Sequence, residues 1–364
     1  MIPRESQPQP RQIIPFPAAA IRRVYEPAPP EPAQTAPVGL GWIVLGVLVA
    51  VTFAGLALFG TTWLEARRVS RAIERIPTAM PHSDAVPPAK PVAPARGENV
   101  LVAGLDGDRK VADALGGRSD AIMVFHLDAD RAHAWVVSVP RDAWVSIPGR
   151  GENKLNTAFS LGGAPLFVRT LETLTGLPMD HLVVIDWTGF RRLTDALGGV
   201  PLSLVSTGSG MPAAAAPGVA LEMSGGMALE YLSERRAFPA GDVDRVRRQQ
   251  LVLRALFGQA LERRTLSDVY AMRDIAAAVG DGVRVDATMT TSELLALMDA
   301  VRRLRLDDVT FLVAPVAHGG NRDDAGTVTV EEALGHGLWS AMASDSMSAF
   351  VTAHPDLVTS ADAN

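Results

Sequence analysis

The chain has 364 residues, 48% of them hydrophobic, and a formal net charge of -6 at pH 7. This size allows a substantial apolar core in one large or two modest domains. Because nucleic-acid binding depends on neutralising phosphates with lysine and arginine, the negative net charge argues against nucleic acid as a partner. The absence of cysteine excludes disulfides, thiolate nucleophiles and cysteine-based metal sites.

The first 97 residues separate into three segments by composition. Residues 1–37 are rich in proline, alanine and glutamine, which predicts a disordered cytoplasmic tail. Residues 41–63 are almost wholly apolar, enough for a helix to cross a hydrocarbon core of about 30 Å, and Trp42 and Trp63 would lie at its interfaces. We therefore expect one transmembrane helix over residues 38–64. A Pro/Ala-rich extracytoplasmic linker is expected over residues 65–97.

The orientation of the transmembrane helix does not follow from charge. Four arginines lie within residues 67–75, directly after the apolar segment. By the positive-inside rule they favour the orientation opposite to an exported C-terminal domain. An extracytoplasmic domain therefore has to be inferred from other features of the sequence.

Short β-type runs alternate with helical segments from residue 98 onward. Strands are expected at 99–103, 121–127, 132–139, 143–147, 181–185, 200–205 and 309–313, and helices at 165–175, 188–197, 226–236, 242–264, 266–279, 291–304 and 330–343. Such alternation predicts an α/β (mixed α+β) fold: a three-layer domain with a central mixed β-sheet flanked by helices, preceded by one transmembrane helix.

Residues 121–139 form a predicted β-hairpin with charged residues at its open end. Two apolar runs are split by a turn-like Asp-Ala-Asp-Arg at 128–131. Because antiparallel strands bring the start of one beside the end of the other, Arg118 and Asp120 should lie near Arg141 and Asp142. The two histidines inside the hairpin are interpreted as strand residues rather than catalysts.

A second group of polar residues opens the helix expected at 242–264. Asp242, Arg245, Arg248 and Gln249 share one face at helical spacing. A solvated face with internal Asp-Arg pairs explains this pattern equally well. Taken with the acids at strand ends, however, the arginines suit a metal-bound pyrophosphate, since carboxylates bind Mg²⁺ and guanidinium groups bind phosphate oxygens. The P-loop, zinc-protease and hydrolase-elbow motifs are absent.

Several motifs occur in a definite order along the chain. They are NVLVAGLD at 99–106, GRSDAIMV at 117–124, SVPRDAWVSIPG at 138–149, ENKLNTAF at 152–159, DALGGVPL at 195–202, GGMALEYLSERR at 225–236 and GDVDRVRRQQ at 241–250. In this order they resemble the LytR-CpsA-Psr family, membrane-anchored enzymes that attach glycopolymers to bacterial peptidoglycan. The resemblance covers residues 98–262, the expected catalytic core, and residues 263–364 are expected to be a helical part that completes or extends it.

The resemblance implies a Mg²⁺-dependent phosphotransferase at the bacterial cell membrane, with its catalytic domain outside. It would move a glycopolymer from a polyprenyl-pyrophosphate carrier to a peptidoglycan hydroxyl group. By motif position, Mg²⁺ would be bound by Asp106 and Asp120, and the pyrophosphate by Arg118, Arg141, Arg245, Arg248 and Gln249. The site would be lined by Lys154, Asn156 and Arg235. The acceptor hydroxyl would be acted on by Asp142 or Asp242.

Two departures from the family pattern bear on these roles. Ser233 stands where the family often has the first arginine of an Arg-x-Arg pair, so one phosphate contact is missing or replaced. The family pattern Gly-x-Asp-x-Arg is longer in this chain, where it spans residues 104–109 and contains two aspartates. Either Asp106 or Asp108 is therefore the expected metal ligand. A lipid-pyrophosphate hydrolase and a non-catalytic, membrane-tethered wall-polymer-binding protein are the alternatives to the ligase.

Overall fold

The computed structural model describes residues 73–77, 79–81, 97–105, 119–203, 220–233, 242–262, 275, 277–278, 282–318 and 327–359. The chain divides into two compact units, Met1–Ala57 and Leu58–Asn364, and every described residue belongs to the second. The expected cytoplasmic tail and the transmembrane helix at 38–64 lie outside the described residues. Among the residues that are described, no helix is both long and apolar enough to span a membrane.

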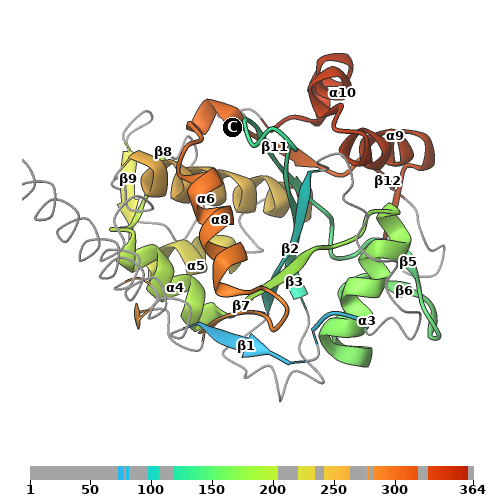
Figure 1. The fold of residues 1–364 in the computed structure, drawn as a ribbon, viewed down its shortest axis with the longest axis horizontal. Coiled ribbons are helices and arrows are strands. Elements are labelled where there is room, and N and C mark those ends of the chain that lie inside the picture. The colour runs from blue at the N-terminus through green and yellow to red at the C-terminus, as the bar shows by residue number, and fades with distance from the viewer. Residues whose placement is uncertain are drawn as a thin grey trace, which may run out of the picture. The chain divides into compact units, whose positions relative to one another are not determined.

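The described strands build a seven-stranded central sheet (Figure 1). In spatial order the strands are β1 (Glu74–Ile76), β10 (Val283–Asp286), β7 (His181–Ile185), β2 (Glu98–Leu105), β3 (Ser119–Leu127), β4 (Ala134–Ser138) and β11 (Val309–Val313). The pairs β1–β10, β2–β7 and β4–β11 are parallel, and the other three neighbouring pairs are antiparallel. The expectation of a central mixed sheet is confirmed.

Among the described residues, three antiparallel strand pairs lie outside the central sheet. They are β5 (Trp144–Ile147) with β6 (Gly151–Lys154), β8 (Val200–Ser203) with β9 (Ala220–Met223), and β12 (Val316–His318) with β13 (Val328–Val330). The described helices are α3 (Thr157–Thr175), α4 (Trp187–Ala196), α5 (Gly225–Ser233), α6 (Asp242–Glu262), α8 (Thr291–Val301), α9 (Glu332–Ala343) and α10 (Met347–Ala353), with short 3-10 turns at Leu306–Asp308 and Pro355–Leu357.

Helices cover both faces of the central sheet. Side chains alternate between the two faces along each strand, and apolar side chains on both faces are buried against these helices. Leu101 and Val124 face one layer of helices and pack in one core with residues of α3 and α9. Val100 and Phe125 face the other layer, where Phe257 of α6 stacks on Phe125 at 6.3 Å between ring centroids. Figure 1 shows α6 and α8 on one side of the sheet and α3 and α9 on the other.

A third apolar core joins α4, α5, α6 and the β8–β9 pair. Its buried members are Leu197, Val200, Leu202, Met223, Ala228, Tyr231, Val252 and Leu256. Helix α6 therefore contributes to two cores at once, one against the sheet and one against α5. This double packing holds its N-terminal half beside the start of β3.

Helix α3 begins earlier than the sequence predicts. The expected helix at 165–175 corresponds to its second half, and Pro165 follows a break at Gly162 and Gly163. Gly163 has φ 64° and ψ -161°, a conformation that is essentially restricted to glycine. A first half beginning at Thr157 precedes this break, and its short length gave too little periodicity to be recognised.

Two segments outside the expected catalytic core contribute strands to the central sheet. Strand β1 lies within the 65–97 segment that composition assigns to a linker, and it pairs with β10. The 263–364 part contributes two strands to the central sheet: β11 matches the strand expected at 309–313, whereas β10 was not expected. Strands β1 and β10 are short and carry little pattern of their own. Arg284 of β10, for example, is buried, and Glu74 and Asp186 lie against its guanidinium group.

Candidate functional site

Four side chains of alternating charge form a connected group at the end of the β3–β4 hairpin. Arg141 Nη1 donates a hydrogen bond to Asp120 Oδ1 at 2.6 Å, and Arg141 Nε donates to Asp142 Oδ2 at 3.2 Å. Lys154 Nζ lies 3.5 Å from Asp142 Oδ1. The four side chains are each less than a quarter exposed, so these ion pairs are screened less than surface pairs. We refer to Asp120, Arg141, Asp142 and Lys154 as the charged cluster.

The hairpin register explains why Asp120 and Arg141 meet. Met123 pairs with Ser138 in the antiparallel ladder of β3 and β4. Continuing that register towards the open end of the hairpin places Asp120 opposite Arg141. The expectation that the two ends of this stretch lie together is confirmed for these two residues. Arg118 lies outside the described residues.

The β5–β6 hairpin brings Lys154 and Asn156 to the same place. Lys154 pairs with Trp144 across that hairpin, and the Asn156 N–H donates to the Arg141 carbonyl oxygen at 3.0 Å. Asn156 is buried, and within the described part of the chain its Oδ1 accepts no hydrogen bond. Buried polar atoms in proteins almost always have a partner, so Oδ1 is a candidate acceptor for a donor group of a ligand.

Helix α6 supplies three consecutive polar side chains with different contacts. Gln249 Nε2 donates to the main-chain oxygen of Asp120 at 3.4 Å. Arg248 is buried: its Nη1 donates to the Tyr231 carbonyl oxygen at 2.6 Å, and its guanidinium carbon lies 5.6 Å from the Tyr231 ring centroid. Gln250 Nε2 donates to a serine hydroxyl at the end of β4 at 3.1 Å. Gln249 therefore borders the charged cluster, while the other two side chains bind α6 to its neighbours.

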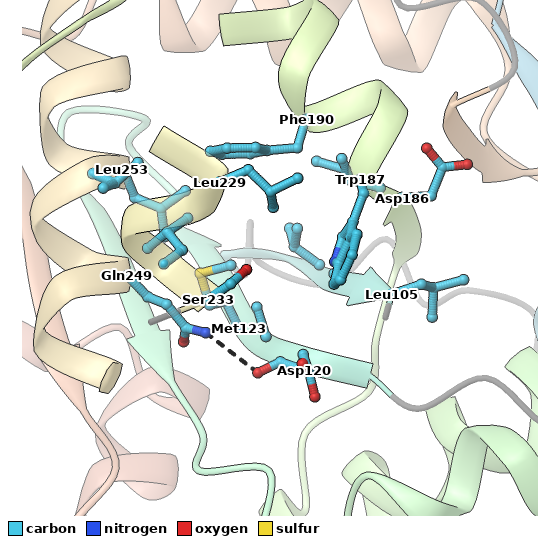
Figure 2. A pocket seen from close by; sticks show the side chains of 16 residues that line it. Leu105, Asp120, Met123, Asp186, Trp187, Phe190, Leu229, Ser233, Gln249 and Leu253 are labelled. Atoms are coloured by element: carbon cyan, nitrogen blue, oxygen red, sulfur yellow. Dashed lines mark hydrogen bonds between the residues drawn. The ribbon is translucent and has the colours of Figure 1, made fainter. Parts of the chain in front are cut away.

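An apolar cavity of about 130 Å³ adjoins the charged cluster. It is lined by Val102, Gly104, Leu105, Asp120, Ala121, Met123, Ile185, Asp186, Trp187, Phe190, Leu229, Leu232, Ser233, Gln249, Val252 and Leu253. Figure 2 shows Trp187 and Phe190 of α4 facing this space, with the contact between Gln249 and Asp120 at its lower border. Asp120 is thus shared between the charged cluster and the cavity wall.

Some of the expected site residues are not described. Asp106, Arg118 and Arg235 lie outside the described residues, and for Asp242 and Arg245 the structure describes only the backbone, within α6. Ser233, which stands where the family often has an arginine, lines the apolar cavity. Of the expected residues, the structure brings together Asp120, Arg141, Asp142, Lys154, Asn156 and Gln249.

The sequence motifs did not predict the aromatic wall of the cavity. Trp187 and Phe190 are three residues apart on α4, so they share one face of the helix. The same spacing is typical of any helix packed on a core, and nothing in it distinguishes a cavity from a filled interior. The signal that the sequence did offer for this wall was the position of α4 in the chain. Helix α4 follows β7 directly, and β7 pairs with β2 in the centre of the sheet.

The charged cluster can bind an anion or a cation. Arg141 and Lys154 are donors suited to phosphate oxygens, whereas Asp120 and Asp142 hold those donors in place. For Mg²⁺, the Asp120 carboxylate offers the hard oxygen ligand that this ion prefers. Mg²⁺ commonly uses one or two carboxylates and completes its shell with water and phosphate oxygens, so the donor chemistry at Asp120 fits the ion.

The chain is similar to known proteins in sequence. A family model described as the LytR_cpsA_psr family matches residues 70–336. The chain is 33% identical over 189 residues to a polyisoprenyl-teichoic acid–peptidoglycan teichoic acid transferase TagU of Halalkalibacterium halodurans, covering 52% of this chain and 60% of that protein. It is 33% identical over 245 residues to a probable cell wall biosynthesis protein LcpB of Corynebacterium glutamicum, covering 61% and 53%. The match thus spans little more than half the length of these relatives.

Solved structures show the same fold. A LytR-Csp2A-Psr enzyme from Actinomyces oris superimposes with a TM-score of 0.58 at 21% identity, covering 74% of this chain and 96% of that chain. A structure described as TagT bound to LIIa-WTA gives a TM-score of 0.54 at 22% identity, covering 69% and 91%. The family model covers most of this chain, including every strand of the central sheet. The chain therefore belongs to the LytR_cpsA_psr family.

Proposed function

We propose that this chain is a phosphotransferase that moves a glycopolymer from a polyprenyl-pyrophosphate carrier to a hydroxyl group of peptidoglycan. The observation that carries the proposal is the contact between the charged cluster and the apolar cavity, which share Asp120. A lipid pyrophosphate has the same two parts, an anionic head on an apolar chain. The relatives named polyisoprenyl-teichoic acid–peptidoglycan teichoic acid transferases support a substrate of this class.

The head group would bind to the cationic side chains of the cluster. Arg141 presents a planar guanidinium that can donate to two phosphate oxygens, and Lys154 supplies a compact positive charge. Gln249 adds an amide donor at the border with the cavity. From the family motifs we add Arg118, Arg235, Arg245 and Asn156 to the pyrophosphate-binding set. Arg248, which the motifs also suggest, is instead buried against Tyr231 and supports α6. The lipid chain would extend from the head group past Trp187 and Phe190.

The reaction is a displacement at phosphorus. The oxygen of the acceptor hydroxyl forms a bond to the phosphorus next to the sugar, and the bond from that phosphorus to the bridging oxygen breaks. The electron pair leaves with polyprenyl phosphate, and a phosphodiester joins the glycopolymer to peptidoglycan. Arg141 and Lys154 stabilise the charge on the phosphoryl oxygens, which is the main demand of phosphoryl transfer.

The proton of the acceptor hydroxyl goes to a carboxylate in this scheme, with Asp142 and Asp242 as the candidates. Both oxygens of Asp142 already face cations, Oδ2 towards Arg141 and Oδ1 towards Lys154. Those contacts favour a positioning role for Asp142, because they orient the two phosphate-binding side chains. Asp242 is then the preferred proton acceptor.

Asp120, together with Asp106, would hold Mg²⁺, which would neutralise charge on the pyrophosphate oxygens. We further propose that residues 38–64 anchor the protein in the cell membrane by a single pass, with the catalytic domain outside the cell. There the domain meets both the lipid-linked donor and peptidoglycan. These partners contain no nucleic acid, in agreement with the net charge of -6.

Transfer can be tested with the full chain, a short polyprenyl-pyrophosphate-linked saccharide and purified peptidoglycan. Arg141→Ala should lower kcat/KM by about 100-fold, because it removes a donor aimed at the transferring phosphoryl group. Arg303→Ala is the matched control: Arg303 is 70% exposed at its side chain and pairs with Asp299 at the end of α8. The control variant should keep wild-type kcat/KM, and circular dichroism should show both variants folded.

The products separate the proposed ligase from its alternatives. Saccharide linked to peptidoglycan through a phosphodiester, lost in Arg141→Ala, supports the ligase. Free phosphorylated saccharide with no linkage to peptidoglycan identifies a lipid-pyrophosphate hydrolase. Binding of the donor without turnover identifies a non-catalytic wall-polymer-binding protein. Full transfer by a folded Arg141→Ala variant contradicts the assigned role of the charged cluster.

A further inference from the structure

His126 lies beside two carboxylates at the closed end of the β3–β4 hairpin. Its Nε2 atom is 3.5 Å from Asp128 Oδ1 and 3.9 Å from Asp345 Oδ1. One ligand atom from each residue lies within 4.8 Å of the other two. Asp345 comes from the turn between α9 and α10, so the group joins two segments that are far apart in sequence. The His126 side chain is 1% exposed, and the Asp345 side chain is 35% exposed.

The protonation of His126 follows from its other ring nitrogen. Asn99 Nδ2 donates to the Pro178 carbonyl oxygen at 3.0 Å, which fixes the orientation of the Asn99 amide. Asn99 Oδ1 therefore faces His126 Nδ1, at 2.7 Å. An amide oxygen only accepts hydrogen bonds, so Nδ1 carries the proton. In the neutral ring the Nε2 lone pair is then directed at the two carboxylates.

This arrangement matches a metal ligand with its supporting contacts. A histidine that binds a metal usually donates its second N–H to an oxygen, as His126 does to Asn99. The two carboxylates are also held, since Asp128 Oδ1 accepts from Trp135 Nε1 at 2.7 Å and Asp345 Oδ1 accepts from the Ala129 N–H at 3.1 Å. Ligating carboxylates typically have such hydrogen bonds.

We propose that His126, Asp128 and Asp345 bind a divalent transition-metal ion of the Zn²⁺ class. Metal–ligand distances of about 2.0–2.2 Å place tetrahedral ligands roughly 3.3–3.5 Å apart. The distances of 3.5 and 3.9 Å from Nε2 to the two oxygens exceed this spacing by a few tenths of an ångström, and the two oxygens lie within 4.8 Å of each other. Water completes the tetrahedron. The imidazole ligand favours Zn²⁺ over Mg²⁺, which prefers oxygen ligands alone.

The space around the imidazole depends on a glycine. A Cβ atom at Gly97 would lie 2.7 Å from His126 Nε2 and 2.3 Å from its Cε1. The absence of a side chain at Gly97 therefore lets the ring occupy its present position.

The site is structural and separate from the proposed reaction centre. His126 lies six positions after Asp120, a distance of about 20 Å along β3. The ion ties the hairpin turn to the α9–α10 turn, reinforcing the hydrogen bond between Ala129 and Asp345. A failure to bind Zn²⁺ would therefore not contradict the proposed phosphotransferase activity. Absence of that activity would likewise not contradict the Zn²⁺ site.

The test uses the untagged full chain after treatment with a chelator. Isothermal titration with Zn²⁺ should show one ion per chain, and Co²⁺ should give the intense visible absorption of a tetrahedral site. Asp345→Asn should weaken Zn²⁺ binding at least tenfold. The substitution is mild, because Asp345 has φ 56° and asparagine also tolerates this conformation. An amide oxygen can keep the hydrogen bond from Ala129.

Asp130→Asn is the matched control, since Asp130 belongs to a neighbouring, more exposed group with Asp128 and His133. It should leave the Zn²⁺ affinity unchanged. Excess Mg²⁺ should not displace the Zn²⁺. Three results overturn the proposal: no stoichiometric Zn²⁺ binding by the wild-type chain, equal affinity in Asp345→Asn, or a loss confined to Asp130→Asn.

Discussion

Asp286 shows how the fold stabilises a single buried charge. Its side chain is completely buried at the end of β10. It accepts hydrogen bonds from the Leu182 N–H at 3.1 Å and the Met289 N–H at 2.9 Å, and lies 3.2 Å from His181 Nδ1. Burial opposes ionisation, but the contacts with His181, Thr288 and Leu182 outweigh it and lower the pKa of Asp286 to about 2. Burial also opposes ionisation of His181 and by itself would lower the pKa of this group. The hydrogen bond and charge of Asp286 raise the pKa by more, so the net shift of the His181 pKa is upward.

This pair predicts a pH window for stability. The contribution of Asp286 is complete above its ordinary pKa of 3.8 and is lost as pH falls towards 2. The contribution of His181 is complete below 6.5 and is lost as pH rises through its raised pKa. Asp286→Asn should therefore lower the free energy of unfolding most between about pH 4 and 6.5. The part of this loss of unfolding free energy that arises from the shifted pKa of Asp286 is about 2 kcal/mol.

Urea unfolding of the wild type and Asp286→Asn from pH 3 to pH 8 measures the difference. Asp307→Asn, an exposed substitution, is the control and should unfold like the wild type at each pH. A difference between the wild type and Asp286→Asn that is constant over this range would contradict the assigned pKa shifts.

At the scale of elements, the break in α3 connects the charged cluster to the core. The first half of α3 begins after Asn156 beside the charged cluster, and the second half buries Phe167 and Leu171. Gly163 lies at the break, where its backbone conformation allows the helix to restart at Pro165. The two halves can therefore meet different neighbours while remaining one connected element.

Gly163→Ala should destabilise the protein by about 1–3 kcal/mol, because only glycine readily adopts this conformation. A Cβ atom at Gly163 would have no contact closer than 3.8 Å, so the cost is conformational rather than steric. Gly226→Ala in α5 is a control of opposite sign. Its Cβ would have ordinary contacts only, so it should stabilise by about 0.4–1 kcal/mol. Chemical denaturation measures both, and equal effects would refute the role of the break.

At the scale of the whole domain, the C-terminal residues cover an edge of the central sheet. Strand β11 is the last strand of that sheet. Val358 forms an antiparallel bridge to Leu312, and the Thr359 N–H donates to the Phe311 carbonyl oxygen at 2.9 Å. The Thr359 hydroxyl also donates to Gln250 of α6. Exposed edge strands promote aggregation, so this cover both protects the sheet and ties it to α6.

Removal of residues 358–364 should lower the free energy of unfolding by about 2 kcal/mol, from the lost hydrogen bonds. The Tm should fall by several degrees, and light scattering should detect aggregation on heating. Removal of residues 361–364 is the matched control, because it keeps Val358 and Thr359. If the longer deletion leaves Tm and scattering unchanged, the edge does not depend on this segment.

The sequence by itself determined the local pairing around the charged cluster. Two apolar runs separated by a short turn specify a hairpin, and the hairpin register alone places Asp120 opposite Arg141. The order of motifs also predicted the family, and the alternation of strand-like and helical segments predicted the central mixed sheet. These features depend on neighbours close in sequence or on a pattern spread along the chain, so they can be read without knowing the packing.

Only the tertiary structure decided what surrounds that cluster. The cavity beside Asp120 is enclosed by helices α4, α5 and α6, whose apolar faces look like ordinary core faces in sequence. Arg248 lies against Tyr231 because α5 packs beside α6, and β10 joins the sheet because its partners β1 and β7 surround it. The group of His126, Asp128 and Asp345 joins residues more than 200 positions apart. Such contacts are determined by how the elements pack together, and no local pattern records them.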